Sequence, residues 1–517
     1  MSILTVDHLN HGFGDREIMK DVSFRMNRGE HIGLVGANGE GKSTFMSIVT
    51  GKLVPDEGKI EWARHVKAGY LDQHATLQKG MSIRDVLQNA FSSLFEMEEN
   101  MNALYEQMGD PDADMDALLE EAGILQDLLT AHDFYMIDSK VDEVARALGL
   151  MDLGLDTDVT ELSGGQRTKV LLAKLLLEKP DILLLDEPTN YLDAEHIVWL
   201  QRYLTEYENA FVLISHDMPF LNSVVNVIYH MNNCELTRYA GDYNHFLEVY
   251  EVQKAQKEAA YERQQKEIAD LKDFVARNKA RVATRNMAMS RQKKLDNMEM
   301  IELEREKPKP EFFFKTARTP GRVLFEAKNL VIGYDEPLSR PLDFLMERKQ
   351  KIVLTGANGI GKTTLLKSLL GLIDPLEGTI EKDDYLEIGY FEQEMRQDIE
   401  TSCIDEIWNE FPGWNQYEVR SALAKCGLTT KHIESKVRVL SGGEQAKVRL
   451  CKLLNRETNL LVLDEPTNHL DVDAKTELKR ALIEYPGSIL MVCHEPDFYE
   501  GLATEVRDCT EWTTRLY

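Results

Sequence analysis

The sequence predicts an α/β protein in which two tandem domains of one fold are joined by a helical hairpin. Three observations lead to this prediction. Long segments of the first half return in the second half. Each copy places a glycine-rich loop between an apolar run and an amphipathic run, which is the strand–loop–helix order of a phosphate-binding fold. Between the two copies lies a highly charged stretch without glycine.

The repeat sets the domain organisation. "GLVGANGEGKSTFMSIVTG" returns as "VLTGANGIGKTTLLKSLLG", and "ILLLDEPTNYLD" returns as "LLVLDEPTNHLD". The offset between copies is 320 residues at the glycine-rich loop but 278 at the later motifs, so the first copy carries 42 additional residues between them. We therefore expect a first domain over 1–250 with an inserted arm at about 85–139, a linker over 251–320 and a second domain over 321–517.

Composition limits the class of protein. The chain has 517 residues, a formal net charge of −28 and six cysteines without a CxxC pair. No apolar run approaches 18 residues, and the first residues do not resemble a secretory signal. We expect a cytoplasmic protein with reduced thiols. Such an acidic chain repels nucleic acid at long range, so any RNA contact requires a local basic element.

The glycine-rich loops fit the GxxxxGK[ST] motif twice. Their glycines let backbone N–H groups converge on phosphate oxygens at a helix N-terminus. The lysines are expected to reach the β- and γ-phosphates, and the following hydroxyls to ligate Mg²⁺. The residues that match are Gly36, Gly41, Lys42, Ser43, Gly356, Gly361, Lys362 and Thr363.

Two carboxylates follow a continuous apolar run in each copy. "DILLLDEP" and "NLLVLDEP" are typical of buried parallel strands whose C-terminal ends face a ligand crevice. Asp186 and Asp464 suit a Mg²⁺ shell, and Glu187 and Glu465 are expected to polarise the attacking water as general bases. A solvated turn is the alternative for an acid pair, but the apolar strand before it disfavours that interpretation.

With "LSGGQ" and "LSGGE" beside the two loops, the chain resembles the ATP-binding cassette (ABC) ATPases. The resemblance implies two tandem P-loop ABC ATPase domains, each with a mixed sheet core plus a helical subdomain, joined by the helical hairpin linker. It implies head-to-tail packing that holds two ATPs, each between one P-loop and the opposite signature motif, and hydrolysis at both sites. The ATP-binding residues it adds are Asn38, Gly39, Thr44, Asn358, Gly359, Thr364, Ser163, Gly164, Gly165, Ser441, Gly442 and Gly443.

The same resemblance assigns further roles. Phe13 and Tyr334 match the position of an aromatic that stacks on adenine, although a core aromatic is nearly as good an interpretation for either one. Gln73 and Gln393 join the Mg²⁺ shell. His216 and His494 resemble the family's switch histidine, which contacts the γ-phosphate; a lone histidine is more often structural, but two at matched offsets favour the catalytic role.

The inserted arm of the first copy is predicted to be a helical hairpin. Apolar residues recur with a helical period on both sides of the turn "GDPDAD". Between residues 85 and 139 there are 14 acidic residues and no Lys or Arg. A solvated helical face is one interpretation; the complete absence of basic residues favours a basic protein partner and disfavours RNA.

The stretch between the copies has the opposite charge pattern. Tyr261, Ile268, Leu271 and Val275 are spaced as a coiled-coil seam, and Leu295, Met298 and Ile301 suit a shorter returning helix. The connection, near 278–290, lies in a segment with no acidic residue. We expect a basic hairpin tip that neutralises RNA phosphates at any sequence. The residues expected to do so are Arg277, Lys279, Arg281, Arg285, Arg291, Lys293 and Lys294.

Two cassettes without a membrane span, an acidic arm and a basic linker together resemble the ABC-F family. That resemblance implies a monomer with an intramolecular cassette dimer. Its ATP-closed state binds the ribosomal E site, with the linker against P-site tRNA and 23S rRNA and the arm against the stalk protein L1. The alternatives are an antibiotic-resistance ribosome protection factor, the ATPase subunit of an ABC transporter, and a DNA-maintenance protein. The basic hairpin disfavours the transporter, and the short coiled coil disfavours the last.

Overall fold

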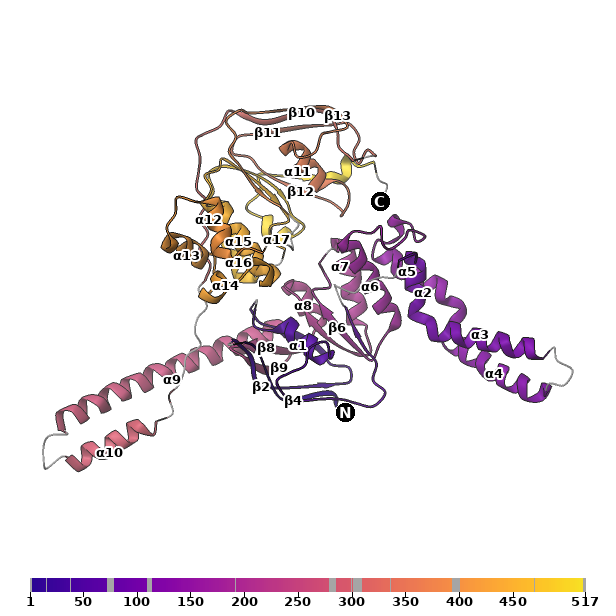
Figure 1. The fold of residues 1–517 in the computed structure, drawn as a ribbon, viewed down its shortest axis with the longest axis horizontal. Coiled ribbons are helices and arrows are strands. Elements are labelled where there is room, and N and C mark those ends of the chain that lie inside the picture. Colours follow the sequence, from indigo (N-terminus) through magenta and orange to yellow (C-terminus); the bar gives the residue numbers. More distant parts are fainter. Residues whose placement is uncertain are drawn as a thin grey trace.

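A computed structural model describes residues 2–514 except 15, 38, 72–78, 109–113, 191, 279–284, 299, 301–308, 335, 393–399 and 469. The side chains at 16, 278 and 285 also lie outside the description. It contains two copies of one α/β unit from which two helical hairpins project in different directions (Figure 1). The predicted α/β class and the tandem arrangement are confirmed. In the described part of the chain, no helix combines the length and the apolar character needed to span a bilayer.

The first copy is built on a six-stranded sheet. Its strand order is β5 (Ala68–Tyr70), β6 (Ile182–Asp186), β7 (Ala210–Ile214), β3 (His31–Val35), β8 (Val227–Asn232) and β9 (Glu235–Ala240). All neighbours pair in parallel except β8 and β9, so the sheet is mixed. A three-stranded antiparallel sheet lies beside it, in the order β2 (Arg16–Asn27), β1 (Ser2–Phe13) and β4 (Glu57–Trp62).

The helices of the first copy pack on these sheets and form the arm. They are α1 (Lys42–Val49), α2 (Ile83–Gln88), α3 (Ser92–Gln107), α4 (Met115–Ala131), α5 (Ile137–Ala147), α6 (Gly164–Glu178), α7 (Ala194–Thr205) and α8 (Met218–Val224). The arm consists of α3 and α4, which pack against each other within the expected insertion. Short 3-10 turns occur at Asn89–Phe91, Phe134–Met136 and Met151–Leu153.

The second copy repeats the plan with a smaller sheet. Five parallel strands follow the order β14 (Ile388–Phe391), β15 (Leu460–Asp464), β16 (Ser488–Val492), β12 (Lys351–Thr355) and β17 (Glu505–Asp508). The small antiparallel sheet is β11 (Leu342–Glu347), β10 (Val323–Val331) and β13 (Glu377–Lys382). This large sheet is parallel throughout its named strands, whereas the large sheet of the first copy is mixed.

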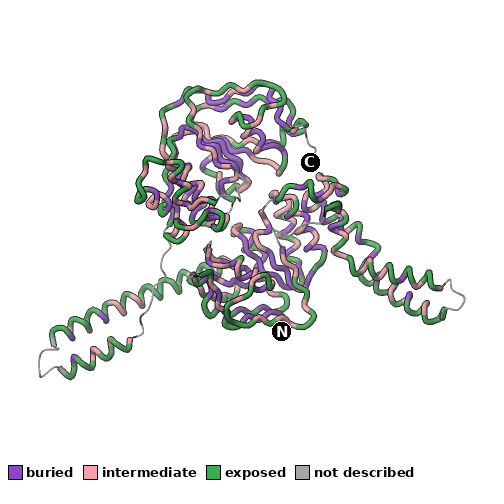
Figure 2. The backbone as a smooth tube through the Cα atoms, viewed as in Figure 1, coloured by how far each residue is buried: buried purple, intermediate pink, exposed green. Residues whose placement is uncertain are grey.

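In the described residues of the second copy, the helices include no counterpart of the arm. They are α11 (Lys362–Leu370), α12 (Cys403–Glu410), α13 (Gln416–Lys425), α14 (Thr430–Glu434), α15 (Gly442–Asn455), α16 (Val472–Glu484) and α17 (Pro496–Tyr499), with 3-10 turns at Val437–Val439 and Cys509–Glu511. Figure 2 shows that burial is concentrated in the two large sheets and that the two hairpins are mostly exposed.

Each large sheet separates two hydrophobic cores. In β6, Ile182 and Leu184 face the core shared with the small sheet and α1, whereas Leu183 and Leu185 face the core of the helical layer. All four side chains are fully buried. Because side chains alternate along a strand, a strand covered on both faces must be apolar at every position. The acid pair after β6 therefore stands at the end of a rigid, buried strand.

The linker hairpin consists of α9 (Tyr243–Asn278) and α10 (Arg285–Asp296). Ile268 and Val275, seven residues apart on the predicted seam, are buried, as is Ala288 of α10. The helix α9 begins before the expected linker start at residue 251, because Phe246 and Tyr250 pack on the first copy. The connection at 279–284 lies outside the described residues.

Candidate ATP sites

The first P-loop connects β3 to α1 through backbone that only glycine adopts easily. Gly41, which precedes α1, has φ 103°, and a Cβ on it would lie 2.4 Å from Ile18 Cγ2. A Cβ on Gly36 would lie 2.4 Å from the Met231 carbonyl oxygen. The Lys42 ammonium is buried and donates to the carbonyl oxygens of Gly36 (2.7 Å) and Ala37 (3.1 Å). The loop is therefore folded around its lysine.

The second P-loop has the same construction. Lys362 Nζ donates to the carbonyl oxygens of Gly356 and Ala357, both at 2.7 Å, and burial lowers the pKa of this lysine. Neither α1 nor α11 has a side-chain N-cap hydrogen bond, and the positive dipole end of each helix attracts an anion. Ser43, Thr44, Thr363 and Thr364 lie in these first turns; Asn38 lies outside the described residues.

The acid pairs stand where the sequence places them, at the ends of β6 and β15. The backbone of Glu187 has φ 50° and that of Glu465 has φ 48°, which is the left-handed region that non-glycine residues rarely adopt. The same uncommon conformation at both matched positions turns each glutamate away from the strand direction, and backbone strain of this kind is often associated with functional sites.

The aspartates have the character of cation ligands. Asp464 is fully buried, and burial raises the pKa of its carboxyl to about 7. Neither of its oxygens has a hydrogen bond of standard geometry, although the Thr363 hydroxyl lies close enough to oppose that pKa shift. Burial likewise raises the pKa of Asp186, and Ser43 opposes the shift. A carboxylate and a hydroxyl at a phosphate site fit Mg²⁺, which takes oxygen ligands and keeps several of its ligands from water and phosphate. Gln73 and Gln393 lie outside the described residues.

Each glutamate pairs with the histidine predicted for it, but the two pairs differ. His216 Nε2 lies 3.7 Å from Glu187 Oε1, and the His216 backbone N–H donates to Glu187 Oε2 at 3.3 Å. Burial and the neighbouring Asp186 raise the pKa of Glu187 to about 8.

In the second copy, His494 Nε2 lies 3.5 Å from Glu465 Oε1. Burial would raise the pKa of Glu465, but His494 and Lys362 outweigh it and hold that pKa below its ordinary value. The repeat therefore contains two glutamates with different proton affinities.

The signature motifs open two helices with the same capping box. The Ser163 backbone N–H donates to Gln166 Oε1 at 2.8 Å, and the Ser441 backbone N–H donates to Glu444 Oε2 at 2.9 Å. Gly164, Gly165, Gly442 and Gly443 form the first turns of α6 and α15. Phe13 and Tyr334 have exposed fractions of 54% and 59%, so both rings are accessible to a base rather than packed in a core.

A hydrogen bond joins the two copies at the nucleotide sites. The backbone N–H of Asn358 in the second P-loop donates to Asp193 Oδ1 of the first copy at 2.9 Å. The sequence reasoning missed this contact, although "EPTNYLD" and its repeat "EPTNHLD" mark Asp193 and Asp471 as a matched pair. Asp471 instead pairs with Lys447 of its own copy at 2.6 Å. The placement of each signature motif opposite the other copy's P-loop stays a prediction.

The basic residues of the hairpin are partly engaged within it. Arg277 pairs with Asp273 at 2.9 Å, and Lys294 pairs with Glu267 at 2.5 Å. Arg291 lies over the Phe274 ring, 3.6 Å from its centroid. An exposed ion pair contributes about 0–1 kcal/mol to stability, so a phosphate can displace either of these two pairs. Lys279 and Arg281 lie outside the described residues, as does the side chain of Arg285; Lys293 is exposed.

Comparison with known proteins places this geometry in a family. A family model described as "ABC transporter" matches residues 19–190 and 339–468, and a second model of the same description matches 229–314. The RNase-L Inhibitor structure superposes with a TM-score of 0.55 at 19% identity, over 97% of this chain and 87% of that chain. This likeness shows the tandem-cassette fold.

Sequence relatives give the branch of the family. The ABC transporter ATP-binding protein YfmM of Bacillus subtilis (strain 168) is 71% identical over the whole of both chains. ABC transporter F family member 2 of Arabidopsis thaliana is 33% identical, over 97% of this chain and 76% of the relative. The energy-dependent translational throttle protein EttA of Haemophilus influenzae (strain ATCC 51907 / DSM 11121 / KW20 / Rd) is 34% identical, over 95% and 89%. The chain is therefore an ATPase that belongs to the ABC-F family of ATP-binding cassette proteins.

Proposed function

We propose that this ATPase binds the ribosome in its ATP-closed state, with the linker hairpin in the E site against P-site tRNA and 23S rRNA, to modulate translation or relieve stalling. Hydrolysis then reopens the cassettes and releases the factor. ATP acts here as a ligand with different affinities for two conformations, and the product of catalysis is a conformational cycle. The name of the EttA relative, a translational throttle, supports a role in translation.

The observation that carries this proposal is that the two ends of the linker are fixed to different copies. At its start, the Phe246 side chain of α9 is buried among residues of the first copy, including Tyr239 and His230 of the sheet. Tyr239 Oη also donates to Gln253 Oε1 at 3.1 Å. The first turns of α9 therefore move with the first copy.

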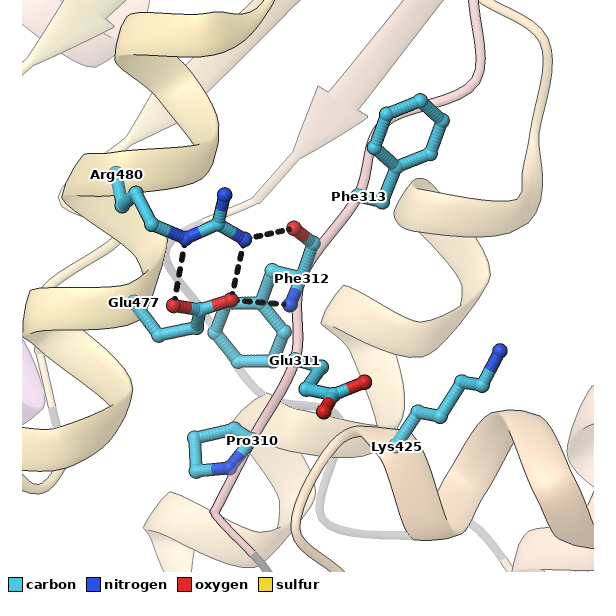
Figure 3. Close-up of a pocket in the computed structure, with 7 residues that line it drawn as sticks. All are labelled: Pro310, Glu311, Phe312, Phe313, Lys425, Glu477 and Arg480. Carbon is cyan, nitrogen blue, oxygen red and sulfur yellow. Dashed lines mark hydrogen bonds and ion pairs between the residues drawn. The ribbon is translucent and has the colours of Figure 1, made fainter.

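At the other end, residues 309–318 form a strap on the second copy. Figure 3 shows both backbone polar groups of Phe312 bound by side chains of α16: its N–H donates to Glu477 Oε1 (2.8 Å), and Arg480 Nη2 donates to its carbonyl oxygen (3.0 Å). Arg480 also binds Glu477 through two nitrogens. Phe312 and Phe314 are buried in the second core, whereas Phe313 between them is 75% exposed.

Two further backbone hydrogen bonds, one before and one after Phe312 in the chain, hold the strap to the second copy. Glu311 N–H donates to the Lys425 carbonyl at 2.7 Å, and Ala317 N–H donates to the Thr458 carbonyl at 2.8 Å. Lys425 ends α13 of the helical layer, and Thr458 precedes β15 of the sheet. Any rotation of one copy against the other must therefore change the position of the hairpin, because its two ends follow different bodies.

The division of charge determines which surface meets RNA. The arm sequence carries 14 acids and no Lys or Arg between residues 85 and 139, whereas 274–295 holds seven Lys or Arg and no acid. The hairpin tip gains affinity by releasing counterions from phosphates, and the acidic arm suits a basic protein such as the stalk protein L1. At the sandwiched ATP, Lys42 and Lys362 would bind phosphates and Glu187 and Glu465 would polarise water. Mg²⁺ held by Asp186, Asp464, Ser43 and Thr363 would neutralise the phosphate charge.

Co-sedimentation with ribosomes tests the proposal. The Glu187→Gln, Glu465→Gln double variant should pellet with ribosomes when ATP is present and stay in the supernatant without nucleotide. A further substitution of Lys293 and Arg291 by glutamate should abolish pelleting at physiological salt, whereas the same substitution at Lys59 and Lys328, exposed on the small sheets, should not. Pelleting that is independent of ATP or of the hairpin charges would overturn the proposal.

A further inference from the structure

The signature motif of the second copy carries a buried charge that the first copy lacks. Both capping boxes have the same geometry, but the residue that closes the box is Gln166 in the first copy and Glu444 in the second. Gln166 is half-buried, whereas the Glu444 residue is only 6% exposed. Glu444 Oε2 accepts from the Ser441 N–H, whereas the second oxygen, Oε1, is buried and has no hydrogen bond of standard geometry in the described part of the chain.

That second oxygen faces a histidine. His432 Nε2 of α14 lies 3.1 Å from Glu444 Oε1, and both side chains are nearly buried, at 13% and 8% exposure. The short helix is fixed in turn by its own cap, in which the His432 N–H donates to Thr429 Oγ1 at 3.5 Å. At the offset of 278 residues that relates the later motifs, the first copy has Gly154, which has no side chain to offer. The ionisable pair is thus specific to the second copy.

The charge of Glu444 affects how well the N-terminus of α15 attracts a phosphate. The N-terminus of α15 offers backbone N–H groups and a positive dipole end, which attract an anion. A carboxylate buried in the same turn satisfies part of that potential and repels an incoming phosphate, and burial strengthens the repulsion because the effective dielectric is low. In its protonated form, a histidine in contact with the carboxylate offsets that charge and leaves the helix end able to accept the γ-phosphate.

We infer that His432 is a positioning residue for the first ATP site: it neutralises Glu444, so that the second signature motif can close on the ATP held by the first P-loop. The inference rests on the proposed head-to-tail closure, which puts Ser441 opposite Lys42. It also makes the two ATP sites unequal, because the first signature motif closes its box with a neutral amide and needs no such partner.

A double-mutant cycle tests the inference. ATP titrations of the steady-state ATPase rate are made in a Glu465→Gln chain, so that turnover reports the first site. His432→Ala should raise the ATP concentration at half-maximal rate about tenfold, the effect expected of one uncompensated charge near the phosphate, with a smaller effect on kcat. In a Glu444→Gln background the same His432→Ala change should alter that concentration by less than about twofold, because no charge is left to neutralise.

Two outcomes distinguish the possible errors. If His432→Ala has the same effect with Glu444 and with Gln at that position, His432 only supports the fold of α14 and the inference is wrong. Equal unchanged curves for all three variants would overturn it as well. Ser441→Arg serves as the separate control for head-to-tail closure: if it leaves turnover at the first site intact, the proposed closure itself is wrong.

Discussion

Three consecutive phenylalanines provide a matched test of the strap. Phe312 is 1% exposed and lies in the core of the second copy, whereas its neighbour Phe313 is 75% exposed. Truncation of a buried phenylalanine to alanine costs about 3–5 kcal/mol, while an exposed one costs within about 0.5 kcal/mol. For a domain of this size each kcal/mol lowers Tm by about 2–4 °C, so we expect Phe312→Ala to lower Tm by about 6 °C or more and Phe313→Ala by about 2 °C or less.

The assay combines thermal unfolding with amide hydrogen exchange. In Phe312→Ala, exchange should accelerate at the strap amides of Glu311, Phe312 and Ala317, which donate to Lys425, Glu477 and Thr458 of the second copy. The P-loop amides should keep their protection, because they belong to the other core of that copy. If Phe312→Ala and Phe313→Ala give the same Tm and the same exchange pattern, the strap is not anchored through its buried phenylalanines and the mechanical coupling is refuted.

Three further predictions concern the contacts between and within the copies. Gln166→Glu places a carboxylate without a histidine partner in the first signature motif, and an ATP titration should show about tenfold weaker apparent affinity at the second site; an unchanged titration would contradict the electrostatic reasoning. Asp193→Ala removes the acceptor of the Asn358 N–H and should slow ATP turnover about tenfold at an unchanged Tm; a normal rate would show that this contact is dispensable. Ile268→Asp buries a charge in the hairpin, which costs at least about 2 kcal/mol of stability, and should weaken ribosome co-sedimentation at an unchanged ATPase rate. The control Ala269→Asp, at an exposed position, should not weaken it. Equal effects of the two variants would exclude a structural role for the seam.

The sequence was sufficient for the parts of the structure that are locally determined. "HIGLV" and "KIVLT" coincide with β3 and β12, because an apolar run of that length before a P-loop has one common structural solution. The paired offsets also located both glutamates and both histidines, which lie together at the strand ends. Because the same motifs occur at matched positions in both copies, a chance match to the motifs is excluded without any knowledge of the fold.

The features that the sequence did not predict all depend on contacts between distant segments. The strap depends on Phe312 and Phe314 entering a core whose other buried members run from Val353 to Leu502. The start of α9 depends on Phe246 packing on the first sheet, so no local signal marks where the helix leaves the body. The counted charges of the hairpin did not reveal that Lys294 pairs with Glu267, 27 residues earlier on the other helix of the hairpin.

The asymmetry between the two ATP sites could not be predicted from the sequence either. The sequence shows His216 and His494 at matched positions, and both sites keep the same residue types. Only the structure shows that burial and Asp186 raise the pKa of Glu187, whereas His494 and Lys362 outweigh burial and hold the pKa of Glu465 below its ordinary value. No spacing rule encodes this difference.

The most direct test of nucleotide-driven hairpin movement is a distance between the hairpin and the second copy. Cysteines are introduced for nitroxide labels at Ser290 of α10 and Thr379 of β13, which are both exposed, and half-buried Cys234 is replaced by serine. Pulsed electron paramagnetic resonance then measures the distance between the two labels. In the hydrolysis-deficient Glu187→Gln, Glu465→Gln chain, ATP should move the distribution to a new, narrower distance. An identical distribution with and without ATP would contradict the coupling of the cassettes to the hairpin.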